Sequence, residues 1–535
     1  MRRIYTSFAL FLGIAIASAQ PDSLAPVSTA LDTNNINFTS MANGDMGWDY
    51  IERTTLAPKT GDAGFLFASS LWLGAPDNTG NLHLAANTYK QNGLDYWPGP
   101  IGDDYDTDYD DTYNRSWLVS SDQIMFHREQ FNLAGYVMPE VIENWPGNGN
   151  TTNGESAQLA PYYDINSNEI YEPHFGDFPL IRGNKAIFIM YNDDREIHAS
   201  SGGAKIGAEV HMMIYAYDSV EPELDNSVFV HYEVFNRGSV DFLEFYAGVF
   251  NDWELGGYAD DYIACDIDRN LSMVFNTDNF DEDIYSVDSL DIINGYGINP
   301  PAAGMVSLNE DIYVHWSWNN NFNPKTGNPE EAEHYFNYLN AMWKDGSINS
   351  WGNNPNYMMS IELEDTTDLD FVTNIPDDRR SLHGVFLPSF LPGESFCLDF
   401  AYVYARNTTY TAKQNAVLLM DYVDDIQVFY DDHFANCTDH TADFDNLSTT
   451  EFSKDLGIEL LKGTGLGELI LSDNSTLPKH YSIQVINILG QPIFSVEWDS
   501  ETELLMNLSK YSQGMYYIQI KNKGKSIKTL PITNE

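Results

Sequence analysis

Short stretches in which apolar residues alternate with polar ones recur through the middle of the chain. Each stretch is bounded by Asn, Asp, Gly or Pro, the residues that favour turns. An alternation with a period of two places every second side chain on one face, as strands of an antiparallel sandwich require. We therefore predict strands at residues 186–191, 210–217, 228–235, 245–250 and 396–404.

Two other segments carry apolar residues at a spacing near 3.6, which predicts helices. The first spans Glu330–Lys344 and stops before Gly346, and the second spans Lys413–Tyr430. Both are interpreted as helices that pack on a core. The predicted fold class is mainly β: antiparallel β-sandwich domains with a few helices.

The first residues have the pattern of a secretory signal peptide. Two arginines precede an apolar run at residues 8–17, which is too short to cross a bilayer as a helix. The small residues Ala17 and Ala19 form the predicted cleavage site before Gln20. No cysteine follows this site, so a lipoprotein anchor is not expected.

A chain of 535 residues is too long for one compact core. After the predicted signal (1–19) and a polar lead (20–30), residues 31–437 form a central β-rich region, expected to contain two sub-domains. Residues 438–450 are polar and acidic and are interpreted as a linker. Residues 451–535 form a separate unit.

Within this last unit, residues 481–488 and 493–498 alternate as strands, and the turn between them contains Gly490. Two later apolar segments, at residues 511–520 and 528–532, close the chain. The motif residues are Gly490, Asn507, Leu508, Ser509, Tyr511, Gly514, Tyr516, Tyr517 and Lys528.

The order and spacing of these residues resemble the type A C-terminal sorting domain of type IX secretion substrates in Bacteroidetes. The resemblance implies that this unit is a small, immunoglobulin-like β-sandwich. It also implies Sec export to the periplasm, passage through the outer-membrane translocon, and handling by a sorting peptidase. The product is then released or held at the cell surface. One departure is the chain end, Thr533–Glu535, where the family has basic residues. The alternative is an ordinary immunoglobulin-like accessory module.

The charge of the chain limits the classes of partner that it can bind. The sequence contains 79 acidic and 27 basic residues, for a net charge of −52. Such a surface repels nucleic acid and anionic membranes, because both are bound through Lys and Arg. It suits divalent cations, although a purely solubilising surface explains the same composition. The three cysteines, Cys265, Cys397 and Cys437, allow one disulfide, whose pairing the sequence leaves open.

One loop has the spacing of a calcium site. Side-chain oxygens at alternate positions, followed by a backbone carbonyl, wrap a hard cation in a tight loop. The predicted ligands are Asp164, Asn166, Asn168, the carbonyl of Ile170, and Asp177. Glu169 stands where such a loop favours glycine. An Asx-rich turn without metal explains the same residues.

A second, weaker cation candidate follows the strand predicted at residues 245–250. Its carboxylates would gather at one end of the sheet, where a cation would offset their mutual repulsion. The alternative is a solvated acidic face. The residues of this second candidate are Asp252, Glu254, Asp260, Asp261 and Asp266.

Motifs for hydrolytic or nucleotide chemistry are missing from the sequence: there is no His-Glu-x-x-His, no Gly-x-Ser-x-Gly, no Walker loop and no dinucleotide fingerprint. A glycosidase needs only two facing carboxylates, and a sequence this acidic does not exclude such a pair. Five tryptophans are candidates for a sugar-stacking platform, and the alternative is that they pack in the core of the sandwich. They are Trp72, Trp97, Trp117, Trp316 and Trp318.

From about residue 31 to 435 the chain resembles large type IX cargo proteins of Bacteroidetes, a resemblance that implies no activity. It rests on residues 67–74, 97–100, 260–266, 339–346 and 378–380. The leading hypothesis is a non-catalytic adhesin or glycan-binding protein with calcium-stabilised loops. The alternatives are an extracellular hydrolase of polysaccharide or peptide, and a structural surface component.

Overall fold

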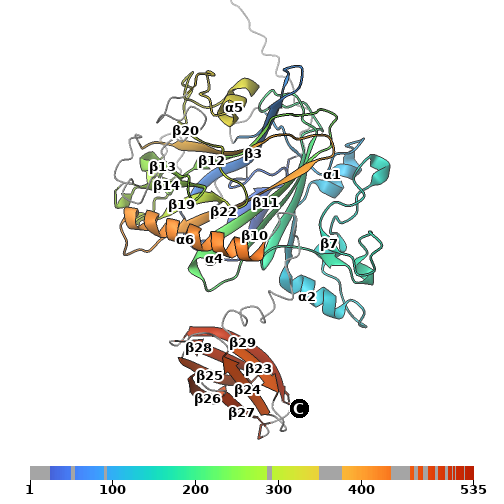
Figure 1. The fold of residues 1–535 in the computed structure, drawn as a ribbon, viewed down its shortest axis with the longest axis vertical. Helices are drawn as coiled ribbons and strands as arrows, with labels where there is room; N and C mark the ends of the chain where they lie inside the picture. The colour runs from blue at the N-terminus through green and yellow to red at the C-terminus, as the bar shows by residue number, and fades with distance from the viewer. Residues whose placement is uncertain are drawn as a thin grey trace, which may run out of the picture.

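The structure is a computed structural model (Figure 1). It describes residues 25–49, 55–88, 93–276, 278–285, 292–348 and 376–434 of the central region. In the C-terminal unit it describes residues 458–462, 468–473, 480–487, 492–499, 504–508, 510–511, 514–522 and 525–534. The predicted signal peptide, with Ala17, Ala19 and Gln20, lies outside these residues, as do Gly490 and Ser509.

A nine-stranded sheet forms one layer of the central region, in the order β13-β14-β19-β22-β11-β10-β9-β5, with β6 also paired to β9. Every pairing in it is antiparallel. The strands are β5 (Trp97–Pro98), β6 (Trp117–Ser120), β9 (Lys185–Asn192), β10 (Ala208–Ala216), β11 (Ser227–Asn236), β13 (Asp261–Asp266), β14 (Leu271–Asn276), β19 (Ala302–Ser307) and β22 (Ser395–Ala405).

A five-stranded antiparallel sheet forms the second layer, in the order β20-β21-β12-β3-β4. Its strands are β3 (Leu66–Pro76), β4 (Leu82–Ala86), β12 (Phe245–Trp253), β20 (Val314–Asn319) and β21 (Arg379–Leu387). The predicted strands correspond to β9, β10, β11, β12 and β22. The mainly β, antiparallel fold class is confirmed.

The two sheets share one hydrophobic core. In β10, Val210, Met212 and Ile214 belong to the core between the sheets, while Met213 and Tyr215 belong to a second cluster on the outer face. The alternation of side chains along the strand therefore fills two apolar layers at once. The core between the sheets draws on residues from 31 to 404.

Two helices cover the outer faces of the sandwich, as predicted (Figure 1). Helix α6 (Ala412–His433) packs on the nine-stranded sheet, and the capping box of Thr411 and Gln414 fixes its start. Helix α5 (Ala332–Leu339) packs on the five-stranded sheet. The polar side of α6 faces solvent, so the helix completes the core without extending the sheet.

An insertion at residues 121–184, between β6 and β9, forms a lobe of short elements. In Figure 1 the lobe, drawn in cyan and teal, lies at the side of the sandwich. Its two-stranded sheet pairs β7 with β8. The elements are α2 (Ser121–Gln130), α3 (Glu140–Glu143), a 3-10 turn at Thr151–Asn153, β7 (Tyr162–Tyr163), a 3-10 turn at Pro173–Phe175, and β8 (Phe178–Pro179).

Several short elements complete the central region. They include three two-stranded pairs, β1–β2, β15–β18 and β16–β17. Their bounds are β1 (Ser28–Leu31), β2 (Phe38–Met41), β15 (Phe280–Asp281), β16 (Ile284–Tyr285), β17 (Ile292–Ile293), β18 (Gly297–Ile298), α1 (Thr107–Tyr113), α4 (Pro222–Asp225) and a 3-10 turn at Tyr258–Asp260.

The C-terminal unit consists of a three-stranded sheet, β23-β24-β27, and a four-stranded sheet, β26-β25-β28-β29. Leu508 and Tyr516 are buried in its core, and the Tyr511 hydroxyl donates to the carbonyl oxygen of Ile493 at 2.8 Å. Asn507 ends β27, Gly514 begins β28, and Tyr517 and Lys528 lie in β28 and β29. The strands are β23 (Ile458–Lys462), β24 (Glu468–Asp473), β25 (His480–Asn487), β26 (Pro492–Asp499), β27 (Leu504–Asn507), β28 (Gly514–Asn522) and β29 (Lys525–Asn534).

The two cysteines that the structure describes differ in bonding state. Cys397, in β22, is disulfide-bonded, whereas Cys265, in β13, is a buried thiol. Cys437, the remaining cysteine of the sequence, lies outside the described residues. The described part of the chain contains no helix long and apolar enough to span a membrane.

Candidate functional site

The predicted calcium loop connects β7 to the turn before β8, at the surface of the lobe. Asp164 organises its first half: one carboxylate oxygen accepts the amides of Asn166 (3.2 Å) and Ser167 (2.7 Å), and the other accepts the amide of Glu169 (2.6 Å). A single carboxylate therefore orders five consecutive residues of the chain, which is how short Asx-based turns are held.

Asp177 closes the same loop from the other side. Its carboxylate accepts the amide of Ile165 at 3.0 Å and that of Glu172 at 2.7 Å, and the residue is fully buried. The amide of Asn168 donates to Glu172, and its oxygen accepts the amide of Ile170. The loop thus brings the predicted ligands Asp164, Asn168, Ile170 and Asp177 into one hydrogen-bonded unit.

Two features of this loop bear on cation binding. The side chain of Asn166 is exposed and has no hydrogen-bond partner among the described residues, so its oxygen is available. Ser167 and Glu169 take left-handed backbone angles, with φ of 59° and 62°. Glu169 occupies the sharp turn where a calcium loop favours glycine. The predicted donors are two carboxylates, two amide oxygens and a carbonyl, which are ligand types that Ca²⁺ binds. In the part of the chain that the structure describes, however, no group of three or more His, Cys, Asp or Glu side chains is placed to hold a metal ion.

The loop is fixed to helix α2 by aromatic and polar contacts. His127 is buried, with Nε2 2.9 Å from the carbonyl oxygen of Asp177 and Nδ1 2.7 Å from the hydroxyl of Tyr136. The guanidinium of Arg128 lies over the ring of Phe178, 4.9 Å from its centre. These contacts join the loop directly to α2.

Large apolar side chains surround this junction and face solvent. Residues 125–175 hold eight of the 22 exposed large hydrophobic side chains of the described chain. An exposed apolar surface of this kind marks an interaction site more often than isolated apolar residues do. The eight residues are Met125, Phe126, Leu133, Val137, Tyr163, Ile165, Ile170 and Phe175.

Two carboxylates of the second predicted cation site are engaged in ion pairs. Asp252 forms a buried ion pair with Arg380 at 3.0 Å, and Asp266 pairs with Arg269 at 2.8 Å. Among the described residues, no group of three or more His, Cys, Asp or Glu side chains is placed to hold a metal ion. Arg380, which is distant in the sequence, thus neutralises Asp252, and Arg269, three positions along the chain, neutralises Asp266.

The remaining members of that cluster lie near Asp281, which the sequence did not single out. Asp260 accepts from the amide of Asn276, and Glu254 is buried. Asp261 and Asp281 are buried, and burial, with the nearby carboxylates adding to it, raises the pKa of Asp261 and raises that of Asp281 to about 7. Raised carboxyl pKa values also occur in glycosidases, but burial keeps a polymeric substrate away from this pair.

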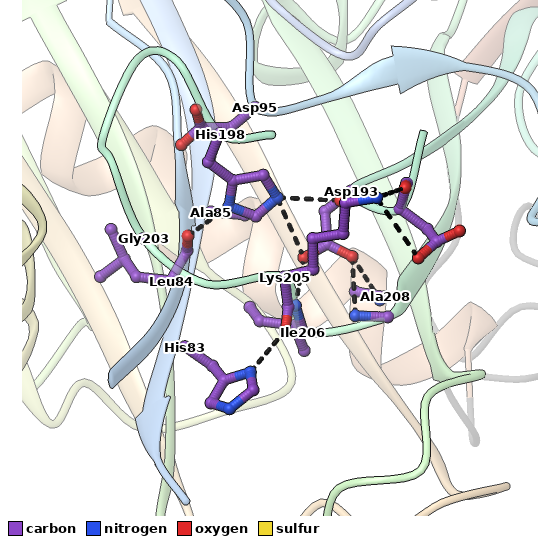
Figure 2. A network of polar contacts seen from close by, with 12 residues as sticks. His83, Leu84, Ala85, Asp95, Asp193, His198, Gly203, Lys205, Ile206 and Ala208 are labelled. Carbon is purple, nitrogen blue, oxygen red and sulfur yellow. Dashed lines mark hydrogen bonds and ion pairs between the residues drawn. The ribbon is translucent and has the colours of Figure 1, made fainter. Parts of the chain in front are cut away.

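A buried polar network joins the two sheets, and Figure 2 shows how it converges on Asp193. The Asp193 carboxylate accepts the amides of Ile206, Gly207 and Ala208 at 2.6–2.8 Å. His198 bridges the Asp193 carbonyl oxygen, at 2.8 Å, to the carbonyl oxygen of Leu84 in β4, at 2.6 Å. Asp193 and His198 are buried, so this network holds the sheets together and offers no surface to a ligand.

Sequence reasoning also missed a buried cluster of charged residues centred on Asp399 in β22. Asp399 accepts from Arg182 (2.9 Å), His231 (2.8 Å) and the hydroxyl of Tyr430 (2.6 Å). Burial raises the pKa of Asp399, but His231 and Arg182 outweigh it and hold this pKa at about 2. The sequence did carry one sign of this cluster, because Asp399 is a charged residue within the apolar strand predicted at residues 396–404. The cluster ties α6 to the nine-stranded sheet.

The tryptophans do not form a sugar-stacking platform. Trp72, Trp316 and Trp318 are buried in the core under α5, and Trp117 is buried beneath the lobe. Trp97 is half-buried, with the guanidinium of Arg195 5.4 Å from its ring centre. Four of the five indoles are therefore core residues, and aromatic stacking of a glycan would need other side chains.

Comparison with known families finds one match, to the secretion system C-terminal sorting domain, over residues 467–532. The match covers β24 to β29 of the C-terminal unit. It agrees with the motif order that runs from Gly490 to Lys528 in the sequence. The central sandwich lies outside this match.

No curated protein matches the chain. Among solved structures, a polysaccharide lyase aligns with 65% of this chain and 38% of its own length, at 10% identity and a TM-score of 0.19. The chain thus spans less than half the length of that structure. A TM-score this low carries no argument for a shared fold or activity.

Proposed function

Since the chain is a type IX secretion cargo, exported to the cell surface or the extracellular space, we propose that it is a non-catalytic adhesin. In this proposal the sorting domain delivers the protein, and the lobe at residues 121–184 makes the adhesive contact. The observation that carries it is the concentration of exposed apolar side chains around the Asp164–Asp177 loop. Such a surface is unfavourable in water unless a partner covers it.

The proposal includes a calcium ion bound by Asp164, Asn166, Asn168, the carbonyl of Ile170, and Asp177. Calcium would supply charge neutralisation and stiffening to a loop that carries three of the exposed apolar residues. Asp164 and Asp177 already accept five backbone amides, so the loop is shaped before the cation arrives. A preorganised site loses less entropy on binding.

Calcium binding is tested by thermal unfolding of the mature chain with EDTA and with Ca²⁺. Because a ligand that binds only the folded state stabilises it, Ca²⁺ should raise the melting temperature and EDTA should lower it. Asn166→Ala removes a ligand that makes no hydrogen bond in the loop, so it should leave the EDTA melt unchanged and shrink the calcium shift. An equal calcium shift in wild type and Asn166→Ala would remove this site from consideration.

The adhesin role is tested by screening the mature protein for binding on arrays of glycans and extracellular proteins, beside an assay for cleavage of polysaccharides and peptides. We expect saturable binding that needs Ca²⁺ and no turnover. Catalytic turnover that survives Phe126→Ser/Phe175→Ser would replace the adhesin with the hydrolase alternative. These two phenylalanines are exposed, so their substitution tests the surface without disturbing the core.

A further inference from the structure

We infer that the lobe recognises a cationic amphipathic protein segment, one that presents apolar side chains flanked by Lys or Arg. The contact surface is named here the lobe face: Phe126, Leu133 and Val137 from α2 and the turn after it, with Ile165, Ile170 and Phe175 from the calcium loop. This inference rests on the proposed adhesin function and specifies its partner.

The two halves of the lobe face are continuous. The ring of Phe126 lies 5.5 Å from that of Tyr136, and Tyr136 contacts His127, which is bonded to the carbonyl oxygen of Asp177. The backbone of Gly176 packs directly on the ring of Phe131. The end of the loop, at residues 176 and 177, therefore lies against His127 and Phe131 at the end of α2.

The surroundings of the lobe face are strongly acidic. Residues 121–177 contain nine Asp or Glu and a single Lys or Arg, Arg128. The guanidinium of Arg128 is already engaged over Phe178. Five of the carboxylates are exposed around the apolar residues, and one bound Ca²⁺ would leave most of their charge in place. They are Asp122, Glu129, Glu140, Glu143 and Glu169.

An apolar surface with an acidic rim favours some binding partners over others. A second copy of the chain would bring an acidic rim against an acidic rim, in a molecule of net charge −52. An anionic membrane surface is repelled for the same reason. A segment with an apolar face and basic flanks satisfies both the apolar centre and the acidic rim, and complementary charge raises both specificity and the association rate.

The test uses the mature protein and a designed Leu/Lys helical peptide whose leucines lie on one face. Controls are a Leu/Glu peptide with the same pattern and a Leu/Lys peptide of the same composition with scrambled order. Binding in Ca²⁺ is followed by fluorescence anisotropy. We expect the patterned Leu/Lys peptide to bind, and Phe126→Ser/Phe175→Ser to weaken it by roughly tenfold or more, as loss of two apolar contacts implies.

The double variant keeps the net charge, so it separates the lobe face from general attraction to an acidic protein. The control is Ile197→Ser/Phe322→Ser, which replaces two apolar residues outside the lobe that are more exposed than Phe126 and Phe175. This control should bind like wild type. Equal binding of the scrambled peptide, or no loss in the lobe-face variant, would overturn the inference. If the Leu/Lys peptides fail but the arrays show calcium-dependent binding, the adhesin proposal survives and the partner class is wrong.

Discussion

Glu169 shows how one residue can limit the candidate calcium loop. Its φ of 62° is a left-handed angle that costs an L-residue about 1 kcal/mol or more, whereas glycine adopts it without that cost. Its amide nevertheless bonds Asp164, which fixes the conformation. The sequence placed a non-glycine residue at this turn, and the structure shows that the turn is made in spite of it.

Glu169→Gly is therefore expected to stabilise the loop. Relief of the left-handed strain exceeds the added entropy of glycine in the unfolded chain, for a gain of about 0.5–1 kcal/mol. Slower hydrogen exchange of the loop amides and tighter Ca²⁺ binding are the measurements. Glu196→Gly, in an exposed loop with ordinary backbone angles, is the control. Faster exchange in Glu169→Gly would show that the glutamate side chain itself supports the loop.

At this scale the sequence predicted contacts between near neighbours and missed those between distant ones. Asp164 and Asp177 are thirteen positions apart, and the loop spacing indicated both. Arg182 and Asp399 are separated by 217 residues, and His198 and Leu84 by 114. Such pairs depend on which strands become neighbours, which no local pattern encodes. For the same reason, the sequence did not indicate that Arg380 pairs with Asp252 and neutralises it.

Elements were predicted best where the alternation or helical spacing is long. Strands β9 to β12 and β22, and helices α5 and α6, each have enough apolar positions to define a period. The lobe was missed because its helices and strands are short and its turns dominate. The candidate loop was found there by its ligand spacing, not by its secondary structure.

The connection from β9 to β10 shows how an element is held by one side chain. Asp193→Ala leaves the amides of Ile206, Gly207 and Ala208 without their acceptor inside the protein. Each buried unsatisfied donor costs about 1–3 kcal/mol, so the free energy of unfolding should fall by about 3 kcal/mol or more. Urea denaturation measures it.

Asp421→Ala is the control for this substitution, because it removes one carboxylate from the exposed side of α6. It should change the free energy of unfolding by less than about 0.5 kcal/mol. A loss below about 1 kcal/mol in Asp193→Ala would mean that water replaces the carboxylate and that the network contributes little to joining the sheets.

At the scale of the whole molecule, the sorting domain and the lobe to which we assign adhesion are separate parts of the chain. The sorting-domain match spans residues 467–532, so it does not include the lobe at residues 121–184. Deleting residues 451–535 is therefore expected to leave the protein in the periplasm, as followed by cell fractionation and by protease access at the surface. Phe126→Ser/Phe175→Ser, with an intact sorting domain, should reach the surface like wild type. Surface display of the truncated chain would separate export from this domain.

The order of strands in the sandwich also sets when it can fold. Strand β21 lies between β20 and β12, and β22 lies between β19 and β11, so the last two strands of the sandwich occupy the interior of both sheets. A chain that enters the periplasm from its N-terminus cannot complete the five-stranded sheet until residue 387 has arrived, or the nine-stranded sheet until residue 405 has arrived. Nascent edges of β11, β12 and β19 stay open until then, when pairing with a neighbouring chain is the main hazard. The interval between translocation of β12 and of β22 is thus the period in which this cargo would depend most on periplasmic chaperones.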